Sequence, residues 1–248
     1  PEQFDNLVLE KRRLVRDQIP PRDELWTASI SSSSIKQLEQ VLDQLKGATA
    51  QLLSADTWLL AVMDAGRMGG EQRRVWENLL GLIDSVFQKS LQGAELLLEH
   101  RPCLPKQPNL NDQIRLLEEI VGHLDGGSKL TWWTGLVCSS WKPLLNDAKV
   151  ATGQPRQATN FRSLLTLAQL QVAREGLVGR WHEQVVVIGG PDIAKVADHP
   201  ESVASRLQEQ IKDTLNWHDQ AWLPIRNQLG QIGFRWDVFM KEIPPDLS

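Results

Sequence analysis

Apolar residues recur at intervals of three and four along most of the chain, which is the spacing of one face of an α-helix. The pattern predicts longer helices over residues 2–18, 35–52, 71–100, 159–186 and 200–230, with shorter ones between them. Glycine and proline pairs interrupt the pattern, because neither residue continues a helix well. The sequence therefore predicts an all-α fold, an elongated bundle of many helices.

Two segments carry the strongest stripes. Residues 35–52 have the three-and-four alternation of a coiled-coil seam, made of Ile35, Leu38, Leu42, Leu45, Thr49 and Leu52. This seam predicts a coiled-coil-like hairpin, and the pattern leaves open whether it pairs within one chain or between two. The second stripe predicts a buried face for the helix over 71–100, made of Trp76, Leu80, Ile83, Phe87, Leu91, Ala94 and Leu98.

Two features qualify the helical pattern near its end. The run "VVVIGG" at 185–190 is the one strand-like stretch, and a lone strand would leave both of its edges unpaired. We interpret it as the tail of the preceding helix. Pro224 predicts a kink in the last long helix.

The run "RPCLPKQP" at 101–108 is the clearest internal break, because its three prolines exclude a helix. We expect an N-terminal helical and coiled-coil part over 1–101 and a tryptophan-rich helical bundle over 102–248. The chain begins at Pro1 and shows no targeting segment. We expect it to be a fragment of a larger protein.

The chain contains ten tryptophans and no tyrosine. Tryptophan buries the largest apolar surface of any side chain, so these residues are expected to anchor helix contacts. The predicted packing anchors are Trp76, Trp133, Trp141, Trp181, Trp222 and Trp236.

Charge and cysteine content narrow the functional classes. The net charge of −4 argues against a chain that grips nucleic acid by itself, since phosphate contacts supply most of that affinity. Two basic clusters remain candidates for phosphate contact within a larger assembly, namely Lys11, Arg12 and Arg13, and Arg73 and Arg74. Two cysteines without a C-x-x-C pair and no apolar run near 18 residues predict a cytoplasmic protein with no membrane contact.

The sequence contains no complete catalytic or cofactor-binding motif. Gly122 and Gly127 have the glycine spacing of a phosphate-binding loop, but Ser128 stands where that motif requires lysine. The five histidines are widely spread, and no close set of metal ligands is visible in the sequence. The chain is therefore predicted to be non-catalytic, with no metal and no cofactor of its own.

One long section resembles a known family. From Trp141 the chain passes a "GQP" loop at 153–155, a helix ending in "RW" at 180–181 and a "GGP" turn at 189–191, and it closes on "GFRW" at 233–236. This order resembles the helical, partly coiled-coil insert of large bacterial superfamily 1 helicase-type ATPases. The resemblance implies a parent protein that is an ATP- and magnesium-dependent motor on DNA. None of the motor motifs lies in this chain, so no functional residue is carried over.

Three hypotheses follow. The resemblance implies a non-catalytic insert that acts as a lever or as a docking surface, whose partners are the rest of its own ATPase chain and, through that parent, DNA. The residue pattern alone also fits a free-standing helical scaffold for protein–protein interaction, of unknown oligomeric state. An all-α enzyme whose site forms from distant residues is the third.

Overall fold

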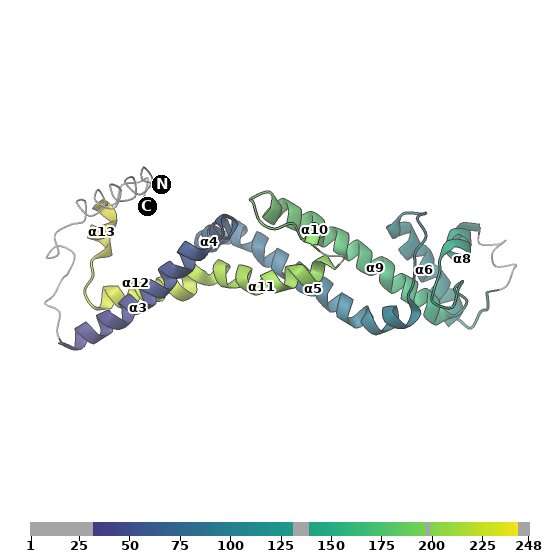
Figure 1. The fold of residues 1–248 in the computed structure, drawn as a ribbon, viewed down its shortest axis with the longest axis horizontal. Coiled ribbons are helices and arrows are strands. Elements are labelled where there is room, and N and C mark those ends of the chain that lie inside the picture. The colour runs from purple at the N-terminus through teal and green to yellow at the C-terminus, as the bar shows by residue number, and fades with distance from the viewer. Residues whose placement is uncertain (1–31, 131–138, 197–198, 243–248) are drawn as a thin grey trace. The chain divides into compact units, whose positions relative to one another are not determined.

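The computed structural model describes residues 32–130, 139–196 and 199–242 (Figure 1). Helices make up almost all of these residues, and the backbone bridges among them are isolated ones, Cys103 with Lys149 and Val150 with Gly153. The predicted all-α class is confirmed. The helix expected over 2–18 and the anchor Trp133 lie outside the described residues.

The chain forms two compact units. The first joins the chain up to Ala55 with the segment from Asn216 onward, and the second is Asp56–Leu215. These units do not coincide with the division expected at 101/102, because the helix before the proline-rich run, Gly70–His100, packs against the helix Ala158–Trp181 that follows it. The run itself also belongs to the second unit. The amide of Cys103 donates to the carbonyl of Lys149 at 2.7 Å, and the reverse bond measures 3.0 Å.

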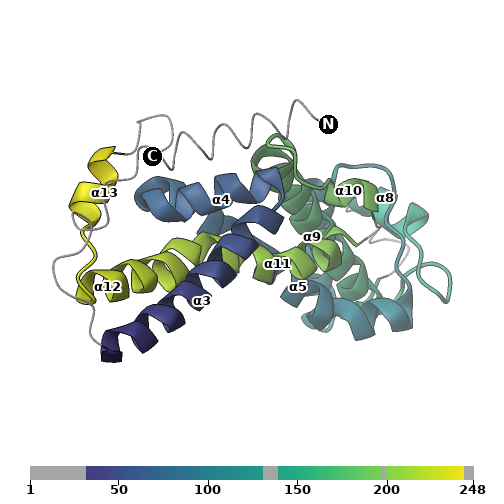
Figure 2. The same ribbon diagram turned by 60° about the vertical axis from the view of Figure 1, so that its left-hand side comes forward.

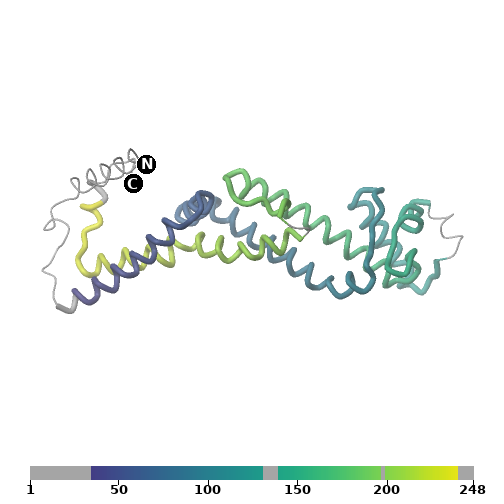
Figure 3. Tube along the Cα trace, in the orientation of Figure 1, coloured from purple at the N-terminus to yellow at the C-terminus, as the bar shows by residue number. Residues whose placement is uncertain are grey.

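The second unit contains the longest helices, whose path is followed most easily in Figure 3. Its α-helices are α4 (Thr57–Met68), α5 (Gly70–His100), α6 (Leu110–Asp125), α8 (Lys142–Asp147), α9 (Ala158–Trp181), α10 (Ile193–Val196) and α11 (Pro200–Trp217), whose last two residues belong to the first unit. A 3-10 turn, η1 (Ser139–Trp141), precedes α8. Helix α9 packs along both α5 and α6.

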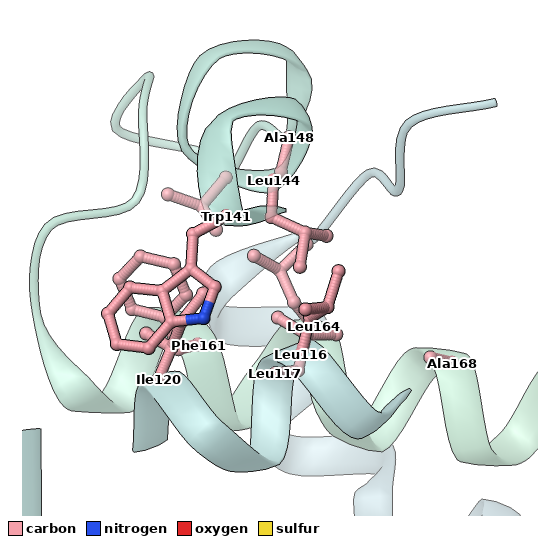
Figure 4. Packing of buried hydrophobic residues seen from close by; sticks show 10 residues of the cluster. Leu116, Leu117, Ile120, Trp141, Leu144, Ala148, Phe161, Leu164 and Ala168 are labelled. Carbon is pink, nitrogen blue, oxygen red and sulfur yellow. The ribbon is translucent and has the colours of Figure 1, made fainter. Parts of the chain in front are cut away.

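Trp141 anchors the core at the α6 end of this unit (Figure 4). Its indole packs with Ile120 and Phe161, and its Nε1 donates to Glu119 Oε2 at 3.2 Å. The other buried members of this cluster come from α6, α8, α9 and the short loop after α8; they are Leu116, Leu117, Leu144, Ala148, Val150, Leu164 and Ala168. The tryptophan-rich stretch thus contributes a packing residue here, as its apolar stripe predicts.

The first unit is built on α3 (Ser32–Ser54), which lies along α12 (Leu223–Gln231) (Figures 1 and 2). The π-helix η3 (His218–Trp222) and α13 (Trp236–Glu242) complete it. The buried residues between α3 and α12 are Val41, Ala48, Ile225 and Leu229. Helix α3 therefore packs within the chain across this contact, through a face that includes Leu38 and Leu45 of the predicted seam.

The buried face of α3 is turned relative to the predicted seam. Val41 and Ala48 are buried, whereas Ile35 and Leu42 are 49% and 43% exposed. Leu38 and Leu45 belong to both alternatives and are half-buried. The prediction was wrong because two stripes with three-and-four spacing run side by side on this helix, and only the position of α12 selects between them.

Helix α5 shows the same kind of displacement. Trp76 and Ile83 are buried as predicted, and Leu79, Val86 and Gly93 complete the buried face. Leu91 and Leu98, which the prediction placed on that face, are 54% and 74% exposed. Gly93 lies where α5 comes close to α9, and a Cβ at this position would come within 2.8 Å of Thr166 Cγ2.

The run at 185–190 forms no strand. Its first two residues end the π-helix η2 (His182–Val186), which continues α9 directly and confirms the interpretation from sequence for this part of the run, and residues 187–189 form a turn. A π-helix also interrupts the last long helix just before Pro224, close to the predicted kink. Both π-helices follow the same order of residues, Trp-His-acid-Gln, at 181–184 and 217–220.

Candidate functional site

The best-defined polar cluster of the second unit is a buried ion pair between α9 and α11. Arg174 Nε donates to Glu201 Oε2 at 2.9 Å, and Arg174 Nη2 donates to Glu201 Oε1 at 2.5 Å. Glu201 is fully buried, and only 18% of the Arg174 side chain is exposed. This two-bond geometry is the strong arrangement for an arginine and a carboxylate.

Two further residues complete the cluster. Ser90 of α5 donates its hydroxyl to Glu201 Oε1 at 3.0 Å. Arg174 Nη2 lies 2.7 Å from His199 Nδ1, and because a guanidinium only donates, His199 Nδ1 accepts in the neutral tautomer that carries its proton on Nε2. Glu201 thereby ties together three helices, and we call Ser90, Arg174, His199 and Glu201 the clamp.

The clamp keeps Glu201 ionised. Burial raises the pKa of this carboxyl, but hydrogen bonds from Arg174, its own backbone amide and Ser90, together with the charge of Arg174, outweigh that effect. The net result is a pKa below the ordinary value of 4.5. The position of Glu201 in the first turn of α11 adds to this, because a carboxylate is favourable at the positive end of a helix.

The geometry of the clamp is that of a structural joint. A serine nucleophile needs a histidine that accepts its proton, whereas Ser90 donates to a carboxylate already held by arginine. His199 faces the guanidinium, which is a donor. The arrangement therefore fixes helices and does not activate a nucleophile.

Sequence reasoning missed the clamp. Pro200 and Glu201 have the sequence pattern of a helix start, with proline in the first turn followed by an acidic residue. The acidic side chain of such a pattern is usually exposed to solvent. Arg174 lies on a helix whose neighbouring polar residues are mostly at the surface. No spacing in the sequence connects these two residues with Ser90, which is 111 positions from Glu201.

The predicted phosphate contacts lie in different environments. Arg73 Nε donates to Glu77 Oε1 at 2.9 Å, one turn along α5. Arg74 is exposed beside it. The other cluster, Lys11, Arg12 and Arg13, lies outside the described residues. Contact of these residues with phosphate stays a prediction.

The predicted anchors divide by burial. Trp76, Trp141 and Trp181 are buried, and Trp181 Nε1 donates to the carbonyl of Pro191 at 2.7 Å. Trp222 and Trp236 are half-buried and meet edge to face, with ring centroids 5.4 Å apart. Indole rings with one edge in contact and one accessible are common at protein interfaces.

A shallow groove of about 270 Å³ lies between α3 and α12 in the first unit. Its lining combines an apolar floor with side-chain amides: Gln37, Gln40, Val41, Gln44, Gln228, Gln231 and Ile232. Amides bind neutral polar groups in both directions as donor and acceptor. Such a lining offers no cation for a phosphate.

The part of the chain that the structure describes contains neither a metal-binding cluster nor a membrane-spanning helix. Over residues 32–130, 139–196 and 199–242, no three His, Cys, Asp or Glu side chains come together in a way that could hold a metal ion. Among the same residues, each helix is too short or too polar to cross a membrane.

Comparison of the chain with protein-family models, curated proteins and solved structures finds no match. The resemblance to the insert of helicase-type ATPases therefore rests on the sequence motifs alone.

Proposed function

We propose that this chain is a non-catalytic helical module that acts as a stiff arm and docking surface within a larger helicase-type ATPase. The clamp is the observation that carries the proposal. A module that transmits force needs helices that do not slide past one another, and a buried, fully bonded ion pair favours one register over others. Glu201 meets both Arg174 and Ser90, so sliding of α5, α9 or α11 breaks its bonds.

The helicase context comes from the sequence order that ends in "GGP" at 189–191 and "GFRW" at 233–236. In this proposal ATP and magnesium are bound by the motor of the parent protein, and DNA is reached through that parent. The partner in direct contact is the rest of the ATPase chain.

The first test examines the gene that encodes this chain. The proposal expects ATPase motifs upstream of Pro1 and downstream of Ser248. In such a parent, removing residues 32–242 should leave ATP hydrolysis measurable and abolish coupled movement on DNA. A parent that still unwinds DNA at the normal rate without the module would contradict a role as an arm.

The second test uses the isolated chain. Purified residues 1–248 should hydrolyse no ATP above background, and a DNA titration at 50 and 200 mM salt should show weak binding at most. Turnover of ATP that follows the protein through successive purification steps would overturn the non-catalytic assignment.

A free-standing scaffold is the second candidate, favoured by the apolar residues that α3 leaves exposed. Ile35, Leu42 and Leu53 are each at least 43% exposed. Sedimentation equilibrium distinguishes this candidate if the scaffold pairs with itself, because a dimer that weakens in Ile35→Ser/Leu42→Ser would support it. A monomer at all concentrations would exclude self-pairing.

A further inference from the structure

Helix α11 covers only part of the α5–α9 pair. Its first turn meets α5 at Ser90, where Glu201 accepts the serine hydroxyl, and Gln208 reaches back to the carbonyl of Leu80 at 3.4 Å. The two helices therefore run antiparallel, with α11 leading away from Ser90 toward the start of α5. Residues 91–100 of α5, about 15 Å of helix, extend past the start of α11.

An apolar stripe of α5 runs past its contacts with α11 into this extension. Phe87, Leu91, Ala94 and Leu98 follow one another at steps of four, three and four, which places them on one face. We call these four residues the α5 stripe. Phe87 and Ala94 are half-buried, whereas Leu91 and Leu98 are the most exposed leucines of α5.

Helix α9 supplies a second side to this face. Arg174 faces α11, and Leu167 and Gln171 precede it by seven and three residues, so they share its side of α9. Both are half-buried. Gly93 of α5 lies against Thr166 of α9, which keeps the two helices close at this level.

The border of the α5 stripe is acidic. Asp84 lies seven residues before Leu91, and Glu95 lies four after it, so both flank the stripe. Each is exposed and forms no ion pair with a described residue. Lys89 lies two residues before Leu91 and so points to another side of the helix.

We propose that an amphipathic, basic helix of a partner protein docks on the α5 stripe. The α5–α9 pair that holds α11 at Ser90 and Arg174 continues past the start of α11, so an added helix occupies a position in line with α11. Its apolar residues at three-and-four spacing cover Leu91 and Leu98, and its flanking lysine or arginine side chains meet Asp84 and Glu95. The site names a surface and partner chemistry for the docking role, and it therefore rests on the proposed function.

The experiment uses the full chain 1–248 and three fluorescent 18-residue peptides. One has leucines at alternating steps of three and four with lysine flanks, the second carries glutamate in place of lysine, and the third is a scramble of the first. Fluorescence anisotropy at 50 and 300 mM salt gives the dissociation constants. The first peptide should bind, more weakly at high salt, and the other two should bind at least about tenfold more weakly.

Variants locate the site. Leu91→Ser/Leu98→Ser should weaken binding of the first peptide by at least about tenfold, because both leucines lose apolar contact. Asp84→Asn/Glu95→Gln should weaken it at 50 mM salt and flatten the salt dependence. Val187→Ser, at a 70% exposed residue after α9, and Glu118→Gln on α6 are the matched controls and should bind as wild type. Thermal unfolding by circular dichroism confirms that all variants fold.

Three outcomes overturn the site: no binding of the first peptide, equal binding by the double-leucine variant, or equal binding of the lysine and glutamate peptides. These failures are distinct from failure of the proposed function. If removing the module from the parent abolishes movement on DNA but no peptide binds, the arm remains and the docking site is excluded.

Discussion

Gly66 of α4 lies directly against the backbone carbonyl of Leu215 in α11. A Cβ at Gly66 would overlap this oxygen, and the carbonyl carbon would be 2.9 Å away. The obstacle is backbone, which cannot rotate away as a side chain can. The close contact of α4 with α11 therefore requires glycine at position 66, even though glycine weakens a helix interior.

Gly66→Ala should destabilise the second unit by about 1–3 kcal/mol, the usual cost of overpacking a core contact. Gly81→Ala is the matched control, because Gly81 is also inside a helix but has nothing within 4 Å of an added Cβ. It should stabilise the protein by about 0.5–1 kcal/mol. Urea unfolding monitored by circular dichroism measures both changes. Two substitutions with the same sign and size would contradict the close contact.

Removing one partner of the clamp should be costly. Arg174→Met leaves Glu201 buried without its charge partner, and the expected loss is about 3–5 kcal/mol in unfolding free energy. The double change Arg174→Met/Glu201→Leu should recover most of that loss, since an apolar pair leaves no buried charge. Arg162→Met is the exposed control: Arg162 pairs with Asp125 at 2.6 Å on the surface, and its loss should cost no more than about 1 kcal/mol.

The depressed pKa of Glu201 predicts how stability depends on pH. Its folded pKa lies below the ordinary 4.5, so between the two values the unfolded chain binds more protons than the folded one. The contribution is therefore complete above about pH 4.5 and is lost as the pH falls through the folded pKa.

The measurement compares wild type with Glu201→Gln by urea unfolding from pH 7 to pH 3. The difference in unfolding free energy between the two proteins should be constant at neutral pH and should shrink in acid, where the wild-type carboxyl is protonated too. A difference that stays unchanged down to pH 3 would show that Glu201 does not titrate in this range.

Trp181→Phe should destabilise the second unit by about 2–4 kcal/mol. The indole is fully buried and its Nε1 bonds the carbonyl of Pro191, so phenylalanine leaves both a cavity and an unpaired carbonyl. Thermal unfolding measures the loss. An unchanged midpoint would mean that the turn at 189–191 rearranges to fill the space, which solvent accessibility of that loop by hydrogen exchange would reveal.

Helix type and approximate extent could be predicted from sequence because apolar periodicity is a local property. Which stripe is buried could not, because the choice depends on the partner helix. On α3, Leu38 and Leu45 fit two adjacent stripes, and the position of α12 selects the one with Val41. On α5, Leu91 and Leu98 fit the periodic pattern. They remain exposed because α11 begins at the level of Ser90 and runs toward the start of α5, away from both leucines.

The clamp escaped prediction for a related reason. Glutamate and arginine are among the residues least often buried, so nothing in the sequence singles out Glu201 and Arg174 as buried. Their burial depends on meeting each other and Ser90 across three helices. Such a meeting is a tertiary property without a spacing that could reveal it. The burial of Trp76 and Trp181, in contrast, could be predicted from the size and hydrophobicity of the indole side chain.

The distance along the chain between Ser90 and Glu201, 111 residues, sets the order in which this unit can be completed during synthesis. Helices α5 and α9 are synthesised before α11. The guanidinium of Arg174 therefore has no carboxylate partner until residue 201 has been synthesised and has left the ribosome. A chain that stops after α9 leaves the cationic side chain of Arg174 on the face of α9 that α11 contacts in the complete unit. Cutting the chain before α11 therefore removes the carboxylate that joins α5 and α9, so α11 belongs with these helices in any fragment meant to fold.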